Sequence, residues 1–160
     1  METIGFEDHN HAFCASSMIA TAEAYCSLNK LQFTPTRRRV LEYLIEERKA
    51  LGAYYILQRL AKDGLGTQPP VAYRALDFLV RHGFVHKVER LNAFVACAYP
   101  HSEHEPAFMI CRSCESVAEA VLRPSSSLIG KAAQEAGFRV EKTIVEAEGL
   151  CPDCAGSGAA

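Results

Sequence analysis

Apolar residues recur at intervals of three and four positions through the first half of the chain, which is the spacing of amphipathic helices. The pattern predicts helices over residues 13–31, 35–49, 53–62 and 70–82. Thr34 before Pro35 is typical of a helix start. The expected inward stripes are Met18, Ile19, Ala22 and Tyr25; Val40, Leu41, Leu44 and Ile45; Ile56, Leu57 and Leu60; and Val71, Ala75, Leu76, Leu79 and Val80.

The period changes from helical to alternating after Gly83, a typical helix-ending residue. Residues 84–88 and 94–97 form two short arms on either side of a turn at residues 91–92. This arrangement is typical of a β-hairpin. Three helices followed by a hairpin predict a winged helix-turn-helix.

Beyond Pro100 the apolar segments become shorter and predict a small α/β domain. Residues 108–110 and 117–122 are apolar stretches, and residues 125–136 have a helical pattern ended by Gly137. Residues 138–148 alternate enough to predict a strand. The expected fold class is therefore α+β. We expect an N-terminal winged helix-turn-helix domain over residues 1–98, with a mobile arm at 1–12, followed by a small α/β domain over residues 99–160, with a frayed tail at 156–160.

The composition favours a cytoplasmic protein with a core of its own. Hydrophobic residues make up 49% of the 160 residues, without an apolar run long enough to span a bilayer. The first residues are acidic and polar, unlike a signal peptide. Seven cysteines in a reducing compartment suggest metal binding before disulfides.

Charge is distributed unevenly along the chain. Residues 34–90 carry 11 Lys and Arg against 6 Asp and Glu, whereas both flanking segments are acidic, and the net charge is −2. A basic segment between acidic ends is typical of a region that contacts phosphates, although an ordinary solvated surface gives the same count.

Two Cys-x-x-Cys pairs, separated by 36 residues, are the strongest chemical signal: Cys111 with Cys114, and Cys151 with Cys154. Four thiolates on two tight turns supply the tetrahedral soft ligands that Zn²⁺ prefers. We expect a structural zinc that holds the C-terminal domain together, because about 55 residues bury too little core to fold unaided.

The helix that begins at Pro70 has a polar face of Tyr73, Arg74, Asp77 and Arg81. Such a face is typical of a recognition helix, and Arg74 could donate two hydrogen bonds to a guanine edge. An amphipathic surface helix is the alternative interpretation. The hairpin and the basic balance favour DNA binding.

A second set of candidate ligands is scattered along the chain: His86, Cys97, His104 and Glu119. Two imidazoles, a thiolate and a carboxylate could form a closed tetrahedral zinc site. Each residue alone has an ordinary interpretation as a polar strand residue or a small buried hydrophobe. The spacing does not decide between these readings.

Five ordered motifs resemble the ferric-uptake-regulator family of bacterial metal sensors, and the resemblance covers about residues 15–155. The motifs are residues 35–38 (PTRR), 70–79 (PVAYRALDFL), 83–88 (GFVHKV), 108–114 (FMICRSC) and 148–154 (EGLCPDC). The resemblance is closest to the zinc-responsive branch of that family.

The resemblance implies a homodimeric repressor that binds palindromic operator DNA when loaded with zinc and controls zinc uptake genes. It implies that the C-terminal domain is a dimerisation domain. It also implies two zinc ions per chain: a structural one held by the four paired cysteines, and a regulatory one held by His86, Cys97, His104 and Glu119. No membrane partner, small-molecule substrate or enzymatic activity is expected.

Details of the motifs favour zinc over other metals. The iron-sensing branch has histidine three residues before the first cysteine, where this chain has Phe108, and Cys97 supplies a soft ligand. Two residues depart from the family pattern. Ala72 stands where the family more often has a β-branched residue and is expected to change operator contacts slightly. Glu115 replaces the common glycine and is expected to alter the turn but not the ligands. His101 could substitute for or assist His104.

Three other readings remain at the level of sequence. An iron, manganese or peroxide sensor of the same family would keep the fold and change the effector. A Cys-x-x-Cys redox enzyme fits poorly, because no βαβ pattern precedes either pair. A zinc-stabilised protein-interaction module would leave the polar face of Tyr73 and Arg74 unexplained.

Overall fold

The computed structural model describes residues 3–4, 11–47, 49–102, 104–122 and 128–156, which divide into two compact units. One unit, the winged-helix unit, comprises the described residues from His11 to His101. The other, the sheet unit, comprises Thr3–Ile4 and the described residues from Ser102 onward. The fold class is α+β, as the sequence predicts.

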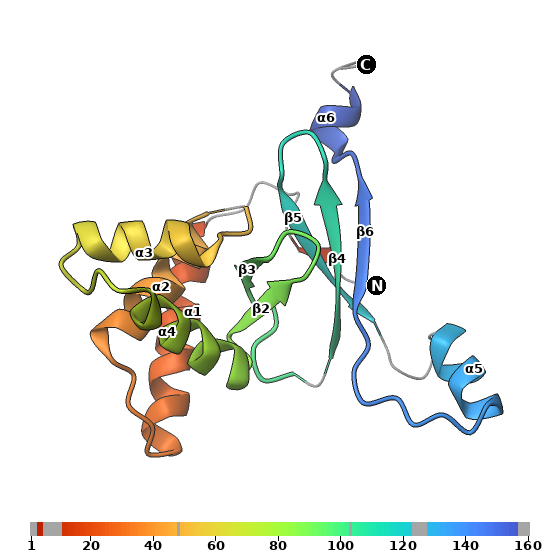
Figure 1. Ribbon diagram of the computed structural model, residues 1–160, viewed down its shortest axis with the longest axis horizontal. Coiled ribbons are helices and arrows are strands. Elements are labelled where there is room, and N and C mark those ends of the chain that lie inside the picture. Colours follow the sequence, from red (N-terminus) through yellow and green to blue (C-terminus); the bar gives the residue numbers. More distant parts are fainter. Residues whose placement is uncertain (1–2, 5–10, 48, 103, 123–127, 157–160) are drawn as a thin grey trace. The chain divides into compact units, whose positions relative to one another are not determined.

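The winged-helix unit contains four helices and a hairpin (Figure 1). Their bounds are α1 (His11–Leu28), α2 (Pro35–Glu46), α3 (Ala53–Lys62), α4 (Pro69–Arg81), β2 (Val85–Val88) and β3 (Ala93–Ala96). The Thr34 side chain accepts a hydrogen bond from the Arg37 backbone N–H at the start of α2. This N-cap confirms the predicted helix start.

The end of α4 is fixed by Gly83, whose φ of +77° lies in the left-handed region. The N–H of Gly83 donates to Val80, and the N–H of Phe84 donates to Leu79. These two bonds form a Schellman motif, in which glycine avoids the steric penalty of other residues. The chain can therefore turn directly from α4 into β2.

The core of the winged-helix unit is built mainly from the predicted helix stripes, together with Tyr43, Ala53 and Ala72, which were not predicted. Ile19 and Ala22 of α1 pack with residues from α2, α3, α4 and the hairpin. Leu51, before α3, bridges Phe94 of β3 through two backbone hydrogen bonds of 2.8 and 2.9 Å. The hairpin is thereby attached to the helices at a defined position.

One predicted core residue, Val80, is wrong: its side chain is 40% exposed. The buried positions of α4 are Ala72, Ala75, Leu76 and Leu79. At 3.6 residues per turn, Val80 projects roughly 90° from the centre of that stripe. Valine therefore marks the edge of the buried face.

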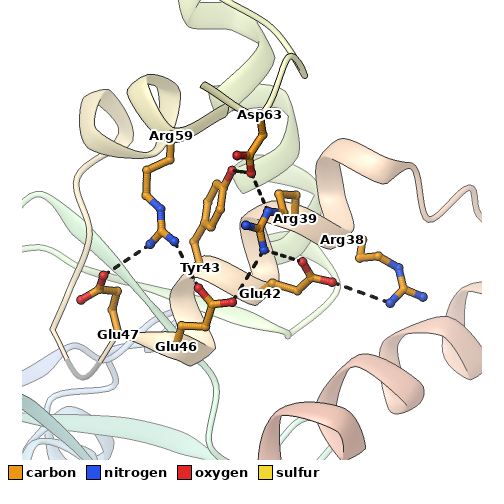
Figure 2. Close-up of polar contacts among 8 residues, drawn as sticks. All are labelled: Arg38, Arg39, Glu42, Tyr43, Glu46, Glu47, Arg59 and Asp63. Atoms are coloured by element: carbon orange, nitrogen blue, oxygen red, sulfur yellow. Dashed lines mark hydrogen bonds and ion pairs between the residues drawn. The ribbon is translucent and has the colours of Figure 1, made fainter. Parts of the chain in front are cut away.

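A polar network between α2 and α3 was not predicted (Figure 2). The buried Tyr43 hydroxyl donates to Asp63 Oδ2 at 2.5 Å, and Arg39 Nε donates to the same oxygen at 2.6 Å. The Arg39 and Arg59 guanidinium groups lie 4.6 and 4.0 Å from the Tyr43 ring centroid. Arg59 also binds Glu46 at 3.1 Å, so that the network joins α2 to the C-terminal end of α3.

The sheet unit is a four-stranded sheet in the order β1-β5-β4-β6 (Figure 1). The strands and helices of this unit are β1 (Thr3–Ile4), β4 (Glu105–Cys111), β5 (Val117–Leu122), α5 (Leu128–Glu135), β6 (Val145–Gly149) and α6 (Pro152–Gly156). Strands β4 and β5 are antiparallel, whereas β4 and β6 are parallel. Cys111 pairs with Gly149 in that parallel register.

The strand predicted over residues 138–148 is shorter, because β6 begins at Val145. Phe138 and Ile144 are 68% and 50% exposed. Strand β4 pairs with only four residues of this segment, from Val145 to Glu148, and with Gly149 after it. Alternation therefore predicts a strand, but pairing with β4 determines its length.

The predicted ends of the chain are described only in part. Of the expected arm, residues 1–2 and 5–10 lie outside the described residues, Thr3–Ile4 pair with β5, and His11 begins α1. Of the expected tail, residues 157–160 lie outside the described residues. Among the described helices, none is long and apolar enough to cross a membrane.

Candidate metal centres and nucleic-acid interface

Three segments of the sheet unit carry the four paired cysteines. Cys111 ends β4, Cys114 lies in the turn to β5, and Cys151 and Cys154 lie at the start of α6. Figure 1 shows that turn and α6 at the same end of the sheet. The Arg112 N–H donates to the Gly149 carbonyl at 2.9 Å, and this bond joins the ends of β4 and β6.

The four sulfur atoms lie within 4.8 Å of one another. The Cys114 and Cys151 sulfurs are 3.7 Å apart. Four thiolates at ~2.3 Å from a tetrahedral zinc would lie about 3.8 Å from one another. The structure therefore brings the predicted ligands together at a spacing that fits the metal.

The acidities of the thiols fit a cation-binding cluster. Backbone N–H groups, first that of Cys114 and then that of Cys151, lower the pKa of Cys111 to about 6. A hydrogen bond with the Ser116 hydroxyl lowers the pKa of Cys114, and the hydrogen bond with Cys151 raises the pKa of Cys154 to about 12. Crowded sulfurs cannot all ionise unless a cation lies among them.

Glu115 occupies the position where the resemblance expects glycine, and its φ is +61°. Its N–H donates to the Cys111 carbonyl at 2.9 Å, and the Cys111 N–H donates to Ser116 at 2.9 Å. The turn therefore keeps a left-handed conformation without a glycine. The departure leaves all four sulfurs in the cluster.

The winged-helix unit contributes one pair of candidate regulatory ligands, His86 and Cys97. His86 lies in β2 opposite Val95, and Cys97 follows β3 with its N–H donating to Phe84 at 2.8 Å. The Cys97 sulfur and a ring nitrogen of His86 lie within 4.8 Å of each other. The hairpin thus brings a soft and a borderline ligand together, which suits zinc.

The sheet unit contributes the other pair, His104 and Glu119. His104 Nε2 lies 3.0 Å from Glu119 Oε1, and His104 Nδ1 lies 2.9 Å from the carbonyl oxygen of Ser102. A carbonyl oxygen only accepts, so Nδ1 donates to it and the ring is held with Nε2 toward the carboxylate. A ligating histidine is commonly oriented by such a bond.

Two supporting residues were missed by sequence reasoning, Ser102 and Ser116. The hydroxyl of Ser116 lies 3.0 Å from the Cys114 sulfur, and that of Ser102 lies 3.0 Å from His104 Nδ1. Each serine lies two residues from a candidate ligand. A small polar residue at that distance is the signal that could have identified them.

The predicted recognition face is present on α4. Tyr73 is 53% exposed, and Arg74, Asp77 and Arg81 are exposed as well. Ala72 is buried in the core, so its departure from the family pattern affects packing and not the exposed face. The prediction that Ala72 changes operator contacts is therefore not supported by its position.

Basic residues also lie on the hairpin. Lys87 and Arg90 are exposed, and Lys87 pairs with Glu89 at 3.3 Å. A helix with an exposed arginine near its N-terminus, followed by a basic hairpin, can contact bases and phosphates of duplex DNA. A winged helix joined to a four-cysteine unit defines a class: DNA-binding proteins with a thiolate metal centre.

The chain belongs to the Ferric uptake regulator family, whose sequence profile matches residues 28–147. The zinc uptake regulation protein of Escherichia coli (strain K12) is 36% identical over 138 residues, which cover 86% of this chain and 81% of that protein. This similarity agrees with the zinc-responsive branch suggested by the motifs.

Solved structures of related proteins have the same fold. A zinc uptake regulator complexed with zinc and DNA matches with a TM-score of 0.84 and 34% identity, over 91% of this chain and 98% of that chain. The crystal structure of holo XcZur matches with a TM-score of 0.78 and 38% identity, over 88% and 98% of the two chains.

Proposed function

We propose that this protein is a zinc-dependent transcriptional repressor that acts in the cytoplasm as a homodimer. It binds palindromic operator DNA when loaded with zinc and controls zinc uptake genes. The observation that carries the proposal is the pairing of Cys97 and His86 on the hairpin, within 4.8 Å of each other. A thiolate beside an imidazole selects zinc over iron and manganese.

Two zinc ions per chain have different roles in this proposal. Cys111, Cys114, Cys151 and Cys154 hold a structural ion, which supplies the folding free energy that the small sheet unit needs. His86 and Cys97 of one unit, with His104 and Glu119 of the other, hold a regulatory ion. A metal ion bound by ligands from both units supplies a link between them.

The recognition residues act on DNA through the orientation of α4. Two copies of α4 in a dimer must match half-sites about one helical turn apart. Without the link, the two units sample many orientations and few of them fit the operator. Metal binding and DNA binding therefore strengthen each other reciprocally, by about 1–3 kcal/mol.

Arg74 and Tyr73 are the proposed base-reading residues, and Asp77 and Arg81 extend the contact along α4. Arginine fits a guanine edge with two hydrogen bonds, and tyrosine can pack on a thymine methyl group or bind a phosphate. Repression of zinc import by zinc-loaded protein then gives negative feedback on the metal.

The test uses Cys97→Ser, with Cys26→Ser as the matched control. Both cysteines are buried, at 0% and 1% exposed, but Cys26 lies outside both candidate clusters of the described residues. We expect Cys97→Ser to keep a folded dimer with one zinc per chain and to lose zinc-dependent DNA binding. The control, Cys26→Ser, should keep two zinc ions per chain.

A full zinc response in Cys97→Ser would contradict the assignment. If the wild-type protein instead binds DNA in response to iron or manganese at lower free metal than zinc, the protein is another sensor of the same family. Metal counting and DNA-binding titration on the same samples separate these outcomes.

A further inference from the structure

His101 is the last residue of the winged-helix unit, and its ring contacts two aromatic rings of that unit. The ring stacks on Tyr25 of α1, with centroids 4.4 Å apart and planes 17° apart. It meets the edge of Phe84 at 4.9 Å and 84°. Stacked and edge-to-face pairs at these distances are attractive.

The two partner rings are themselves firmly held. Tyr25 contacts Phe84 edge-on at 5.4 Å, and a hydrogen bond of 3.3 Å joins its hydroxyl to His82 Nδ1. Phe84 is 2% exposed and its carbonyl accepts the Cys97 N–H. His101 therefore attaches the end of the unit to its rigid part.

The backbone at His101 also points to a fixed position. Its φ is +66°, in the left-handed region, where a residue with a side chain is strained by its Cβ. Such a conformation persists only where surrounding contacts compensate for the strain. The contacts with Tyr25 and Phe84 are those that the structure gives to this side chain.

The chain is held again only a few residues later, within the sheet unit. His104 binds the Ser102 carbonyl through Nδ1 and approaches Glu119 through Nε2. Only two residues separate His101 from His104 in the sequence. The connection at this point of the chain, from His101 to His104, is therefore a very short tether between two anchored side chains.

We propose that His101 is a positioning residue for the zinc response and not a metal ligand. Its ring stack shortens the free tether before His104, so that fewer orientations of the units must be excluded when the regulatory ligands bind zinc. Short tethers raise the effective concentration of the groups that they join. The stack would thus set the free zinc concentration at which DNA binding begins; this inference rests on the proposed function.

The alternative role, in which His101 replaces or assists His104 as a ligand, makes the opposite prediction for one variant. Phenylalanine keeps a flat ring that can stack on Tyr25 but offers no lone pair to a metal. His101→Phe therefore separates stacking from ligation, and His101→Ala removes both.

The experiment measures zinc per chain, and operator binding as a function of buffered free zinc, for the wild type, His101→Ala and His101→Phe. We expect two zinc ions per chain in all three. For His101→Ala, half-maximal DNA binding should need about two- to tenfold more free zinc, with unchanged DNA affinity at saturating zinc. His101→Phe should respond as the wild type does.

Two tyrosine variants test the partner of the stack. Tyr25→Phe keeps the ring and loses the hydroxyl, so its zinc midpoint should stay near the wild-type value. Tyr25→Leu should raise the free zinc concentration at half-maximal DNA binding as His101→Ala does. The double variant, Tyr25→Leu with His101→Ala, should raise it no further than either single variant. Equal additive shifts would show that the two residues act separately.

The outcomes distinguish this inference from the proposed function. Loss of one zinc in both His101→Ala and His101→Phe would make His101 a ligand and overturn the inference. An unchanged midpoint in His101→Ala would also overturn it, even where the wild type responds to zinc. A wild-type protein without zinc-dependent DNA binding would instead refute the proposed function.

Discussion

Glu115 shows how a single backbone position shapes the four-cysteine turn. A left-handed residue with a side chain is strained by about 1–2 kcal/mol relative to an ordinary conformation, whereas glycine is not. Glu115 has φ of +61° immediately after the ligand Cys114. The turn therefore retains strain that a glycine would remove.

We expect Glu115→Gly to stabilise the zinc-loaded protein by about 0.5–1 kcal/mol, because relief of strain exceeds the added flexibility of the unfolded chain. Denaturant unfolding measures the change, and zinc per chain should stay at the wild-type value. Glu115→Ala, which keeps the strained backbone, is the control. A glycine variant less stable than the alanine variant would contradict this account of the turn.

In the proposed function, Arg74 is the residue on which recognition of the operator sequence depends most. Arg74→Ala should weaken operator binding by ~1–3 kcal/mol and relax specificity at one position per half-site, because a bidentate contact to a base edge is lost. Zinc content and dimer mass should not change. Binding titrations on operator and random DNA measure the effect.

An exposed arginine of the sheet unit, Arg139, provides the control. Arg139→Ala should leave operator affinity unchanged. An equal loss on operator and random DNA in Arg74→Ala would make Arg74 a phosphate contact, since phosphate contacts carry no sequence information.

At the scale of elements, the Tyr43 network fixes α2 against α3. The pKa of Asp63 is lowered by the hydrogen bond from Tyr43 and then by that from Arg39, whereas burial and Asp63 raise the pKa of Tyr43 to about 12. Tyr43 therefore remains a donor, and Asp63 remains ionised, near neutral pH. The network should be complete at every pH in that range.

Asp63→Asn should lower the melting temperature at pH 7. Because its folded pKa is depressed, Asp63 stabilises the fold above its unfolded pKa of about 4, and this contribution is lost only as pH falls through the folded pKa. The melting difference from the wild type should therefore stay constant between pH 6 and 8. A difference that changes over this window would show that another group is responsible.

Local signals in the sequence predict most of the elements. The start of α2 is set by Thr34 and Pro35, and the end of α4 by Gly83. Each of these residues works through contacts within one helical turn, so both boundaries can be predicted from the local sequence. The exposed position of Val80 does not follow, because it depends on the direction from which α1, α2 and α3 meet α4. The length of β6 likewise depends on its partner β4.

Contacts between distant residues explain what the sequence did not predict at the sites. The four cysteines come in recognisable pairs, so their cluster could be predicted. His101 and Tyr25 are 76 positions apart, and nothing in the local pattern of either residue indicates a stack.

At the scale of the whole molecule, each of the two units is stabilised in a different way. The winged-helix unit has a continuous hydrophobic core, whereas the four-cysteine cluster joins β4, the following turn and α6 in the sheet unit. We expect Cys151→Ser to lower zinc content, dimer mass and melting temperature together.

Hydrogen exchange should show that the loss of stability in Cys151→Ser is confined to the sheet unit. Amide protection should fall in β4, β5 and β6 and persist in α2, α3 and α4, because their core contains none of the four ligands. Cys26→Ser, the control, should keep the wild-type amide protection in both units. A stable Cys151→Ser dimer with two zinc ions per chain would rule out the structural zinc.

The most direct test of the central claim is a titration of operator binding against buffered free zinc, with metal counted on the same sample. We expect half-maximal DNA binding to coincide with uptake of the second zinc per chain, while the first remains bound throughout. Iron and manganese at the same free concentrations should not restore binding. DNA binding that is complete with one zinc per chain, or that responds equally to iron, would contradict the account.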